Sequence, residues 1–185
     1  NNPKLKYPFL CLLVSGGHTQ IWKVNSFGNY SLLATTRDDA VGEAFDKGAR
    51  ILGLGYPGGP EIEKIAISGD NNSYKFSIPI VKSSRLDFSF SGLKTSLMYK
   101  FREMSHAEKI DNIPHLAASF QEIIIESLFS QLNKIIKKTG ITQVSIVGGV
   151  AANKRLRVMA DTVQNDSMVK IFFPPIEYCT DNAAM

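Results

Sequence analysis

Two glycine pairs, each directly after a short apolar segment, constrain the fold of this 185-residue chain more than any other feature. The first pair, Gly16 and Gly17, lies within residues 10–24, LCLLVSGGHTQIWKV, where residues that favour β-structure flank both glycines. This pattern predicts a strand, a tight turn with positive φ at glycine, and a returning strand. Backbone N–H groups and hydroxyls of such a turn are available to a phosphate, because no Cβ stands in the way. An ordinary hairpin has the same pattern, so both interpretations stay open.

The second glycine pair, Gly148 and Gly149, follows an apolar segment at residues 143–147 and precedes a helix predicted over residues 151–163. A strand, a glycine turn and a helix in this order can bind a phosphate, because N–H groups and the helix dipole face the ligand. The sequence lacks the fuller glycine pattern of dinucleotide-binding proteins here, so this pair alone is a weak signal. Together the two pairs predict one nucleotide-binding region.

The rest of the sequence alternates strand and helix patterns, which is typical of one α/β lobe. Further strands are predicted at residues 30–35 and 170–173, and strands or extended segments at residues 76–81 and 87–90. Four further helices are predicted. The first ends at Leu52, the second covers residues 61–67, and the third begins at Leu93. The fourth covers residues 115–138, with Pro114 in its first turn. Residues 53–60, GLGYPGGP, are predicted to form a loop, and residues 178–182 a loop before a further helix.

Composition sets broad limits on the class of protein. Hydrophobic residues make up 44% of the chain and charged residues 21%, as in an ordinary globular domain. No apolar run approaches the roughly 20 residues that span a bilayer, and we expect a cytoplasmic protein without a membrane partner. Cys11 and Cys179 are not closely spaced, which favours free thiols. The chain starts without Met and stops where a new segment begins, so we expect a piece of a longer protein.

Charged and metal-binding side chains give only open interpretations. Asp38 or Asp39 is predicted to cap the helix that ends at Leu52, and Asp46 within that helix has the pattern of a solvated or salt-bridged residue. His106 and His115 are half a turn out of phase even on one helix, and no complete metal site is visible in the sequence. The net charge of +4 permits a nucleic-acid partner. One basic cluster could contact phosphates or only water: Lys154, Arg155 and Arg157.

Five segments together resemble one family. They are LVSGGHTQ at residues 13–20, DDAVGEAFDKGARILGLGYPGGP at 38–60, FSFSGLKT at 88–95, GGVAANKRLR at 148–157 and CTDNAAM at 179–185. In this order and spacing they resemble the tRNA N6-adenosine threonylcarbamoyltransferases, the TsaD or Gcp family, once described as O-sialoglycoprotein endopeptidases. The resemblance implies an actin-like ATPase fold (ASKHA, with RNase H-like lobes), and this chain as a single such lobe, the C-terminal portion of a two-lobed protein.

The resemblance also implies a role for individual residues. Asp181 matches a carboxylate ligand of the family's catalytic iron or zinc, whereas the family's two metal-binding histidines lie upstream of the first glycine turn, outside this chain. The metal site is therefore expected to be incomplete here. Eight residues are implied to contact the substrate or its nucleotide: Leu13, Val14, Ser15, Gly16, Gly17, Asp46, Gly59 and Asn153.

The implied activity is transfer of a threonylcarbamoyl group from threonylcarbamoyl-AMP to N6 of the adenosine beside the anticodon in tRNAs that read ANN codons. The implied partners are tRNA and TsaB- and TsaE-like proteins, in a bacterial cytoplasm or, alternatively, a mitochondrion. Two other functions were weighed. A metalloendopeptidase of the zincin type would need an H-E-x-x-H helix, which the sequence lacks. A nucleotide-binding module without catalysis is the second alternative.

Overall fold

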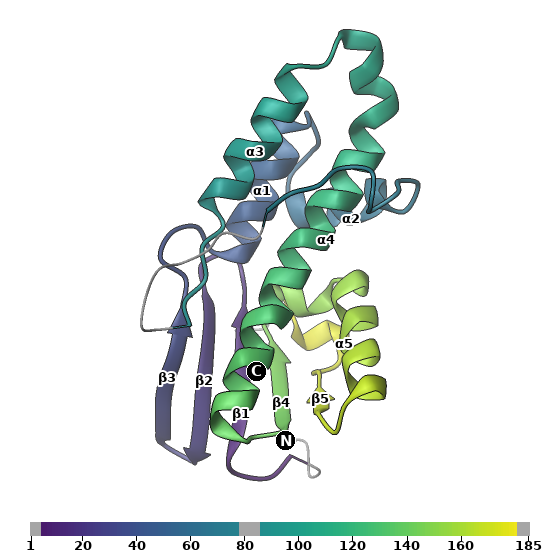
Figure 1. Ribbon diagram of the computed structural model, residues 1–185. Coiled ribbons are helices and arrows are strands. Elements are labelled where there is room, and N and C mark those ends of the chain that lie inside the picture. The colour runs from purple at the N-terminus through teal and green to yellow at the C-terminus, as the bar shows by residue number, and fades with distance from the viewer. Residues whose placement is uncertain (1–4, 78–85, 181–185) are drawn as a thin grey trace.

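A mixed five-stranded sheet lies at the centre of the computed structural model, which describes residues 5–77 and 86–180 (Figure 1). The strands lie in the order β3-β2-β1-β4-β5. The first three pair antiparallel as a meander, whereas β4 pairs parallel with β1, and β5 parallel with β4. Their bounds are Phe9–Val14 (β1), Thr19–Ser26 (β2), Asn29–Thr35 (β3), Gln143–Val147 (β4) and Lys170–Phe172 (β5).

The parallel pairing of β1 with β4 brings the two glycine pairs to one edge of the sheet. In its register Leu13 lies beside Val147, so both strands end at nearly the same level. Gly16 and Gly17 follow the end of β1, and Gly148 and Gly149 follow the end of β4. This edge, beyond the carboxyl ends of neighbouring parallel strands, is where open α/β sheets bind ligands.

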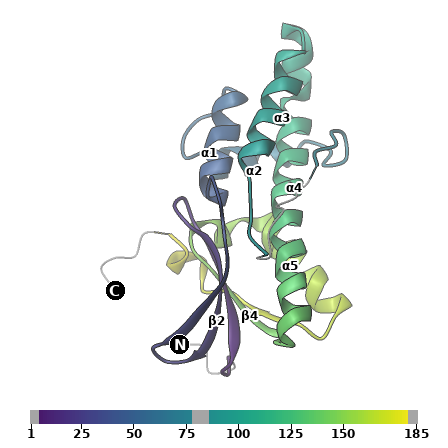
Figure 2. The same ribbon diagram turned by 60° about the vertical axis from the view of Figure 1, so that its left-hand side comes forward.

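Five α-helices and two short 3-10 helices pack around this sheet (Figures 1 and 2). Both views show α4 running alongside the sheet, while α3 and the start of α4 project beyond it as a helical hairpin. None of the helices in the described part of the chain is long and apolar enough to cross a membrane. The helices are α1 (Val41–Ile51), α2 (Gly58–Ala66), α3 (Ser91–Arg102), α4 (His106–Thr139), α5 (Lys154–Asp166), η1 (Gly149–Ala152) and η2 (Ile176–Tyr178).

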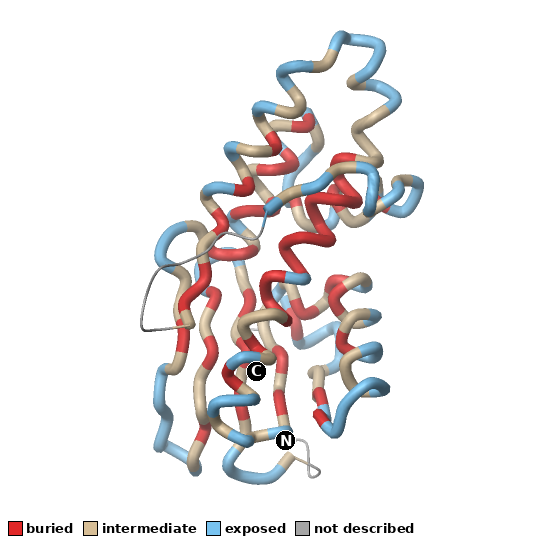
Figure 3. The backbone as a smooth tube through the Cα atoms, in the orientation of Figure 1, coloured by how far each residue is buried: buried red, intermediate tan, exposed pale blue. Residues whose placement is uncertain are grey.

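The core forms where one face of the sheet meets α4 (Figure 3). Alternate residues of β1, from Leu10 to Val14, are fully buried, as the period of a half-buried strand requires. On α4, residues from Leu116 to Leu132 recur every three or four positions and are equally buried. Each such side chain contributes about 1.5–3 kcal/mol relative to an exposed one, so α4 is the main structural helix.

α4 begins nine residues earlier than the predicted start at His115. Ser105 and Glu108 form a capping box, in which the Ser105 hydroxyl accepts from the Glu108 N–H and the Glu108 carboxylate accepts from the Ser105 N–H. Pro114 therefore lies inside the helix and not in its first turn. The predicted start is wrong because the capping box sets the beginning of α4, and this helix continues through a proline that would suit a first turn. Gly140 ends the helix at φ 71°, a left-handed conformation that glycine adopts without steric cost.

Other predicted boundaries shift by a few residues. α2 includes Gly58 and Gly59, which were assigned to a loop, and η1 replaces the first turn predicted for the helix at residues 151–163. Phe88 makes only an isolated bridge with Thr36. Residues 78–81 of one predicted extended segment, and Asp181 and Asn182 of the last loop, lie outside the described residues. Both cysteines are free thiols, as predicted.

Asp38 stabilises a different helix from the one expected. Neither Asp38 nor Asp39 caps α1, whose N-cap residue Ala40 makes no side-chain cap. The Asp38 carboxylate instead accepts hydrogen bonds from the N–H groups of Phe90 (2.8 Å) and Ser91 (3.2 Å), and from two hydroxyls at the start of α3. Partial burial alone would raise the pKa of Asp38, but these hydrogen bonds outweigh it and hold the pKa below its ordinary value.

We expect Asp38→Ala to lower the free energy of unfolding by about 1 kcal/mol, the usual cost of a lost helix cap. Because the folded-state pKa is depressed, the stabilisation is present above the unfolded pKa of about 3.9 and is lost as the pH falls through the folded value. Urea unfolding of the chain and of Asp38→Asn at several pH values measures this. The stability difference between the two should shrink in acid, and an unchanged difference would contradict the assignment. Asp111→Ala, at an exposed helical site, is the control.

Candidate functional site

The turn between β1 and β2 is held by its own backbone and leaves two N–H groups free. The Ser15 N–H donates to the His18 carbonyl (2.9 Å), and the Ser15 hydroxyl accepts from the His18 N–H (3.0 Å). The buried Thr19 hydroxyl accepts from the Val41 N–H (2.7 Å), so the Ser15 and Thr19 hydroxyls each hold one backbone N–H and keep an O–H to donate. Within residues 5–77 and 86–180 no acceptor is bonded to the N–H groups of Gly16 and Gly17.

Neither Gly16 nor Gly17 has positive φ, so the predicted reason for these glycines was wrong. The space around them supplies another reason. A Cβ built at either position meets no atom within 4 Å, which means that this side of the turn is open. At the second turn the constraint is internal, because Gly148 has φ 101° and a Cβ there would lie 2.3 Å from the Val14 carbonyl oxygen.

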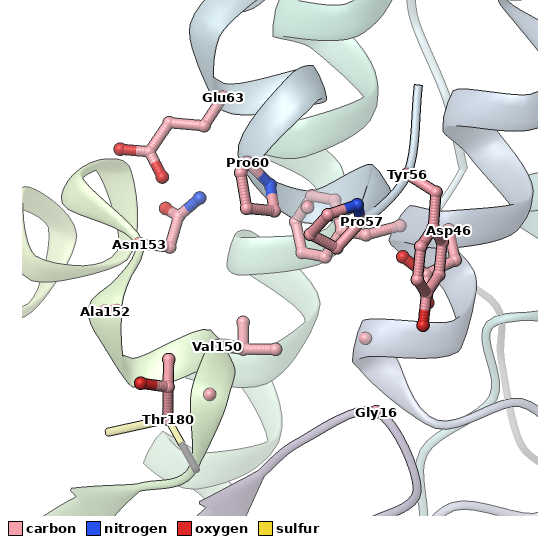
Figure 4. A pocket seen from close by; sticks show the side chains of 14 residues that line it. Gly16, Asp46, Tyr56, Pro57, Pro60, Glu63, Val150, Ala152, Asn153 and Thr180 are labelled. Atoms are coloured by element: carbon pink, nitrogen blue, oxygen red, sulfur yellow. The ribbon is translucent and has the colours of Figure 1, made fainter. Parts of the chain in front are cut away.

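A pocket of about 340 Å³ opens beyond the two turns (Figure 4). This volume is in the range of small-ligand sites. The β1–β2 turn, α1, the α1–α2 loop, α2, η1 and the loop after η2 all contribute to its wall. The lining residues are Gly16, Gly42, Phe45, Asp46, Tyr56, Pro57, Gly59, Pro60, Glu63, Gly149, Val150, Ala152, Asn153 and Thr180.

The pocket brings together four of the eight predicted contact residues: Gly16, Asp46, Gly59 and Asn153. The other four lie next to it in β1 and its turn and are not among the lining residues. The Val14 side chain is fully buried in the core, so Val14 can offer only backbone groups. Asp181 lies outside the described residues. Ligand binding by all of these residues stays a prediction.

Asp46 is neither simply solvated nor part of an ion pair among the described residues. Its carboxylate oxygen Oδ1 accepts a hydrogen bond from the N–H of Gly58 (2.8 Å), and Gly58 is the first residue of α2. A carboxylate at a helix N-terminus is favoured by the unpaired N–H groups and by the helix dipole. Asp46 therefore joins α1 to α2 at the pocket wall, with its second oxygen left for other partners.

Glu63 is a lining residue that sequence reasoning missed. It lies one helical turn after Gly59 on α2, so the two face the same side, and this spacing could have revealed it. Its carboxylate oxygen Oε1 accepts from the Lys154 N–H (3.1 Å) at the start of α5. Asn153 caps the same helix, with its Oδ1 accepting from the Leu156 N–H (2.9 Å). α2 and α5 are thus linked across the pocket.

Two cations of the basic cluster hold the framework of the site together. The Arg155 guanidinium donates two hydrogen bonds of 2.6 Å to the Glu122 carboxylate on α4. Burial alone would raise the pKa of Glu122, but its hydrogen bonds with Arg155 and Asn71 hold it below the ordinary value. The Arg157 guanidinium donates to the Ala151 carbonyl (2.9 Å) and lies 4.5 Å from the Phe173 ring centre. This favours a structural role for both arginines over contact with nucleic acid.

The described residues do not by themselves fit a metal ion. Among residues 5–77 and 86–180, no group of three or more His, Cys, Asp or Glu side chains is placed to hold one. His106 and His115 both lie on α4, and the His115 Nδ1 accepts from the Asp70 N–H.

Comparison with known proteins gives one family. A family model for tRNA N6-adenosine threonylcarbamoyltransferase, TsaD, matches residues 1–185. The chain belongs to the TsaD family. Curated relatives with this name include those of Kosmotoga olearia, 50% identical over 99% of this chain and 54% of the relative, and of Synechocystis, 46% identical over 100% and 55%. The chain spans about half the length of the curated relatives it matches.

Solved structures that resemble this TsaD-family chain confirm the predicted actin-like ATPase fold. Full-length HypF, in a phosphate- and nucleotide-bound form, superposes with a TM-score of 0.72 at 13% identity, over 95% of this chain and 32% of HypF. The activator of 2-hydroxyisocaproyl-CoA dehydratase from Clostridium difficile superposes with a TM-score of 0.52 at 19% identity, over 93% of this chain and 56% of the activator. At these identities the likeness concerns the fold alone.

The two neighbouring glycines at the start of α2 in this TsaD-family chain should respond differently to the same substitution. A Cβ at Gly59 meets nothing within 4 Å and points to open space, so Gly59→Ala should leave the free energy of unfolding unchanged or raise it by up to about 1 kcal/mol. A Cβ at Gly58 would lie 2.6 Å from the Asp46 Cα, so Gly58→Ala should lower it by roughly 1–3 kcal/mol. Denaturant titration of both variants measures this, and equal effects would show that the packing differs.

Proposed function

We propose that this chain contributes the nucleotide site of a tRNA N6-adenosine threonylcarbamoyltransferase. The complete protein would transfer a threonylcarbamoyl group from threonylcarbamoyl-AMP to N6 of the adenosine next to the anticodon in tRNAs reading ANN codons. The observation that carries this proposal is the pocket beyond β1 and β4, because both glycine turns, Asp46, Gly59 and Asn153 meet around it. Family membership supports the reaction, and the nucleotide bound in the HypF structure supports the ligand class.

The residues of the pocket suit an adenylate. The N–H groups of Gly16 and Gly17 are free and accessible, and such groups bind phosphate oxygens. Tyr56, Pro57 and Val150 supply apolar surface for a base (Figure 4). We assign the phosphate and acyl region to residues 13–17, and the nucleoside to Asp46, Gly59 and Asn153. Binding and orientation of the acyl donor toward the adenosine amine are then the contribution of this half of the protein.

Partners and metal belong to the complete protein. We propose tRNA and TsaB- and TsaE-like proteins as its partners, and the bacterial cytoplasm as its location, since the curated relatives are bacterial. Asp181 is proposed as one ligand of an iron or zinc ion whose other ligands are histidines upstream of this chain. The described residues supply no group of three ligands, and no step of the transfer is derived through the metal.

A nucleotide-binding module without catalysis is the second candidate, because the pocket and the fold need no transfer chemistry. A metalloendopeptidase is not favoured, since the sequence has no H-E-x-x-H segment and the relatives carry the transferase name. Turnover separates the two remaining candidates.

We expect the protein, at the full length of its relatives and combined with its partners, ATP, threonine and bicarbonate, to modify tRNA. Mass spectrometry of nucleosides from digested tRNA should detect threonylcarbamoyl-adenosine. A relative from Kosmotoga olearia in a parallel reaction is the positive control. Nucleotide binding without this product, while the control succeeds, would leave the binding module as the function.

The 185-residue chain alone should fold but should be inactive. It should not retain a metal, because one carboxylate binds a divalent ion weakly and catalytic zinc sites collect three protein ligands. Asp181→Ala should therefore change little in this chain but abolish metal retention in the full-length protein. Elemental analysis and circular dichroism of both lengths, with and without the substitution, test this. Stoichiometric, Asp181-dependent metal in the short chain would contradict the expected ligand set.

A further inference from the structure

The Asn153 side chain is nearly fully buried at the pocket wall, with 7% of the residue exposed. Both of its polar atoms have partners in the protein. Oδ1 accepts from the Leu156 N–H (2.9 Å), and Nδ2 donates to Oε1 of Gln121 on α4 (2.9 Å). Gln121 is itself 6% exposed and was not among the predicted site residues.

Chemistry fixes the orientation of both amides. A backbone N–H can only donate, so the Asn153 atom facing Leu156 must be the oxygen. The atom facing Gln121 is then the amide nitrogen, which can only donate, so Gln121 must present its oxygen. An amide nitrogen carries two N–H groups, and Gln121 accepts one of them. No described residue accepts the second.

The second N–H belongs to a group that lines the pocket. Figure 4 shows the Asn153 amide between Glu63 and Pro60, with its nitrogen on the side of Pro60. A neighbouring contact holds the two segments together, since Glu122, next to Gln121 on α4, accepts two hydrogen bonds from Arg155, two residues after Asn153. The direction in which Asn153 donates is therefore built into the fold.

We propose that Gln121 is a positioning residue, which holds the Asn153 amide so that its second N–H donates to a hydrogen-bond acceptor on the nucleoside of the bound adenylate. This inference rests on the proposed nucleotide site and adds that Asn153 recognises the ligand as a hydrogen-bond donor. The ligand must present a ring nitrogen or a ribose oxygen there, and a ligand that presents a donor is rejected because two donors would face each other.

The test uses AMP as the probe and calorimetric titration of the full-length protein. Gln121→Met keeps the volume of the side chain but removes the acceptor, and should weaken AMP binding about 3- to 10-fold, the range for one neutral hydrogen bond. Gln121→Glu keeps an acceptor oxygen and should stay within about 3-fold of the parent. Ser127→Ala removes a buried hydroxyl on the same helix, bonded only to the Ile123 carbonyl, and should leave AMP affinity unchanged.

A panel of analogues separates positioning from mere structural support. The probes are 1-deaza-, 3-deaza- and 7-deaza-AMP and 2′-deoxy- and 3′-deoxy-AMP, each of which lacks one acceptor. The parent should bind one of them about 3- to 10-fold more weakly than AMP, and Gln121→Met should lose this discrimination because the two changes remove the same interaction. Asn153→Asp keeps the oxygen that caps α5 but has no N–H, and should lose the same discrimination.

The outcomes are distinct. The inference would be overturned, while the nucleotide site stands, if the parent binds one analogue more weakly than AMP and both Gln121→Met and Asn153→Asp keep this difference. AMP affinity of Gln121→Met equal to that of the parent would also overturn it. A parent that does not bind AMP at millimolar concentration would overturn the proposed nucleotide site together with this inference. If Gln121→Met does not fold, Gln121→Leu takes its place, because it also lacks the acceptor, and a Gln121→Leu variant that keeps the parent's discrimination between AMP and the analogues would overturn the inference.

Discussion

The parallel pairing of β1 with β4 is the constraint on which the rest of the site depends. It aligns the ends of two strands that are more than a hundred residues apart in sequence, and it sets both glycine turns at one sheet edge. The two chain segments approach each other closely at the ends of β1 and β4, because Gly148 has room for a hydrogen but not for a Cβ beside the Val14 carbonyl. Any shift of this register by one residue would turn the buried side chains of β1 away from the core. Core packing and site geometry are therefore specified by the same interaction.

Around this edge, most helix N-termini are satisfied by side chains from a distant part of the chain. The Thr19 hydroxyl accepts from the first N–H of α1, Asp46 from the first N–H of α2, and Asp38 from the start of α3. The Glu63 carboxylate accepts from the first N–H of α5. The first N–H groups of a helix have no partner within it, so each of these contacts joins two elements as well as ending one. Pocket side chains that cap another helix are held firmly, which is a requirement for recognising a ligand in one orientation.

The sequence predicted the elements better than their junctions. The five strands of the sheet and the long apolar face of α4 follow from local patterns and are confirmed, whereas residues 87–90 make only an isolated bridge. The cap assigned to Asp38 and the role of Asp46 depend on partners 52 and 12 residues away, which no local pattern reveals. The start of α4 is a different case, since its S-x-x-E signal was present in the sequence and Pro114 outweighed it. Gln121 and Glu63 required the fold, because their importance comes from what lies opposite them.

The glycines show why a pocket is harder to predict than a turn. Sequence cannot tell a glycine that packing requires from one that leaves space for a ligand. The structure separates them, because a Cβ at Gly42 or Gly58 would lie within 3 Å of backbone atoms, whereas at Gly16 or Gly59 it would meet nothing. Gly59 is the second residue of α2, and a Cβ there would meet no atom of the described residues within 4 Å, so packing does not require glycine at this position. Gly58 and Gly59 are thus adjacent in sequence but differ in cause, since packing against α1 requires the first to be glycine, whereas the second lines the pocket without such a constraint.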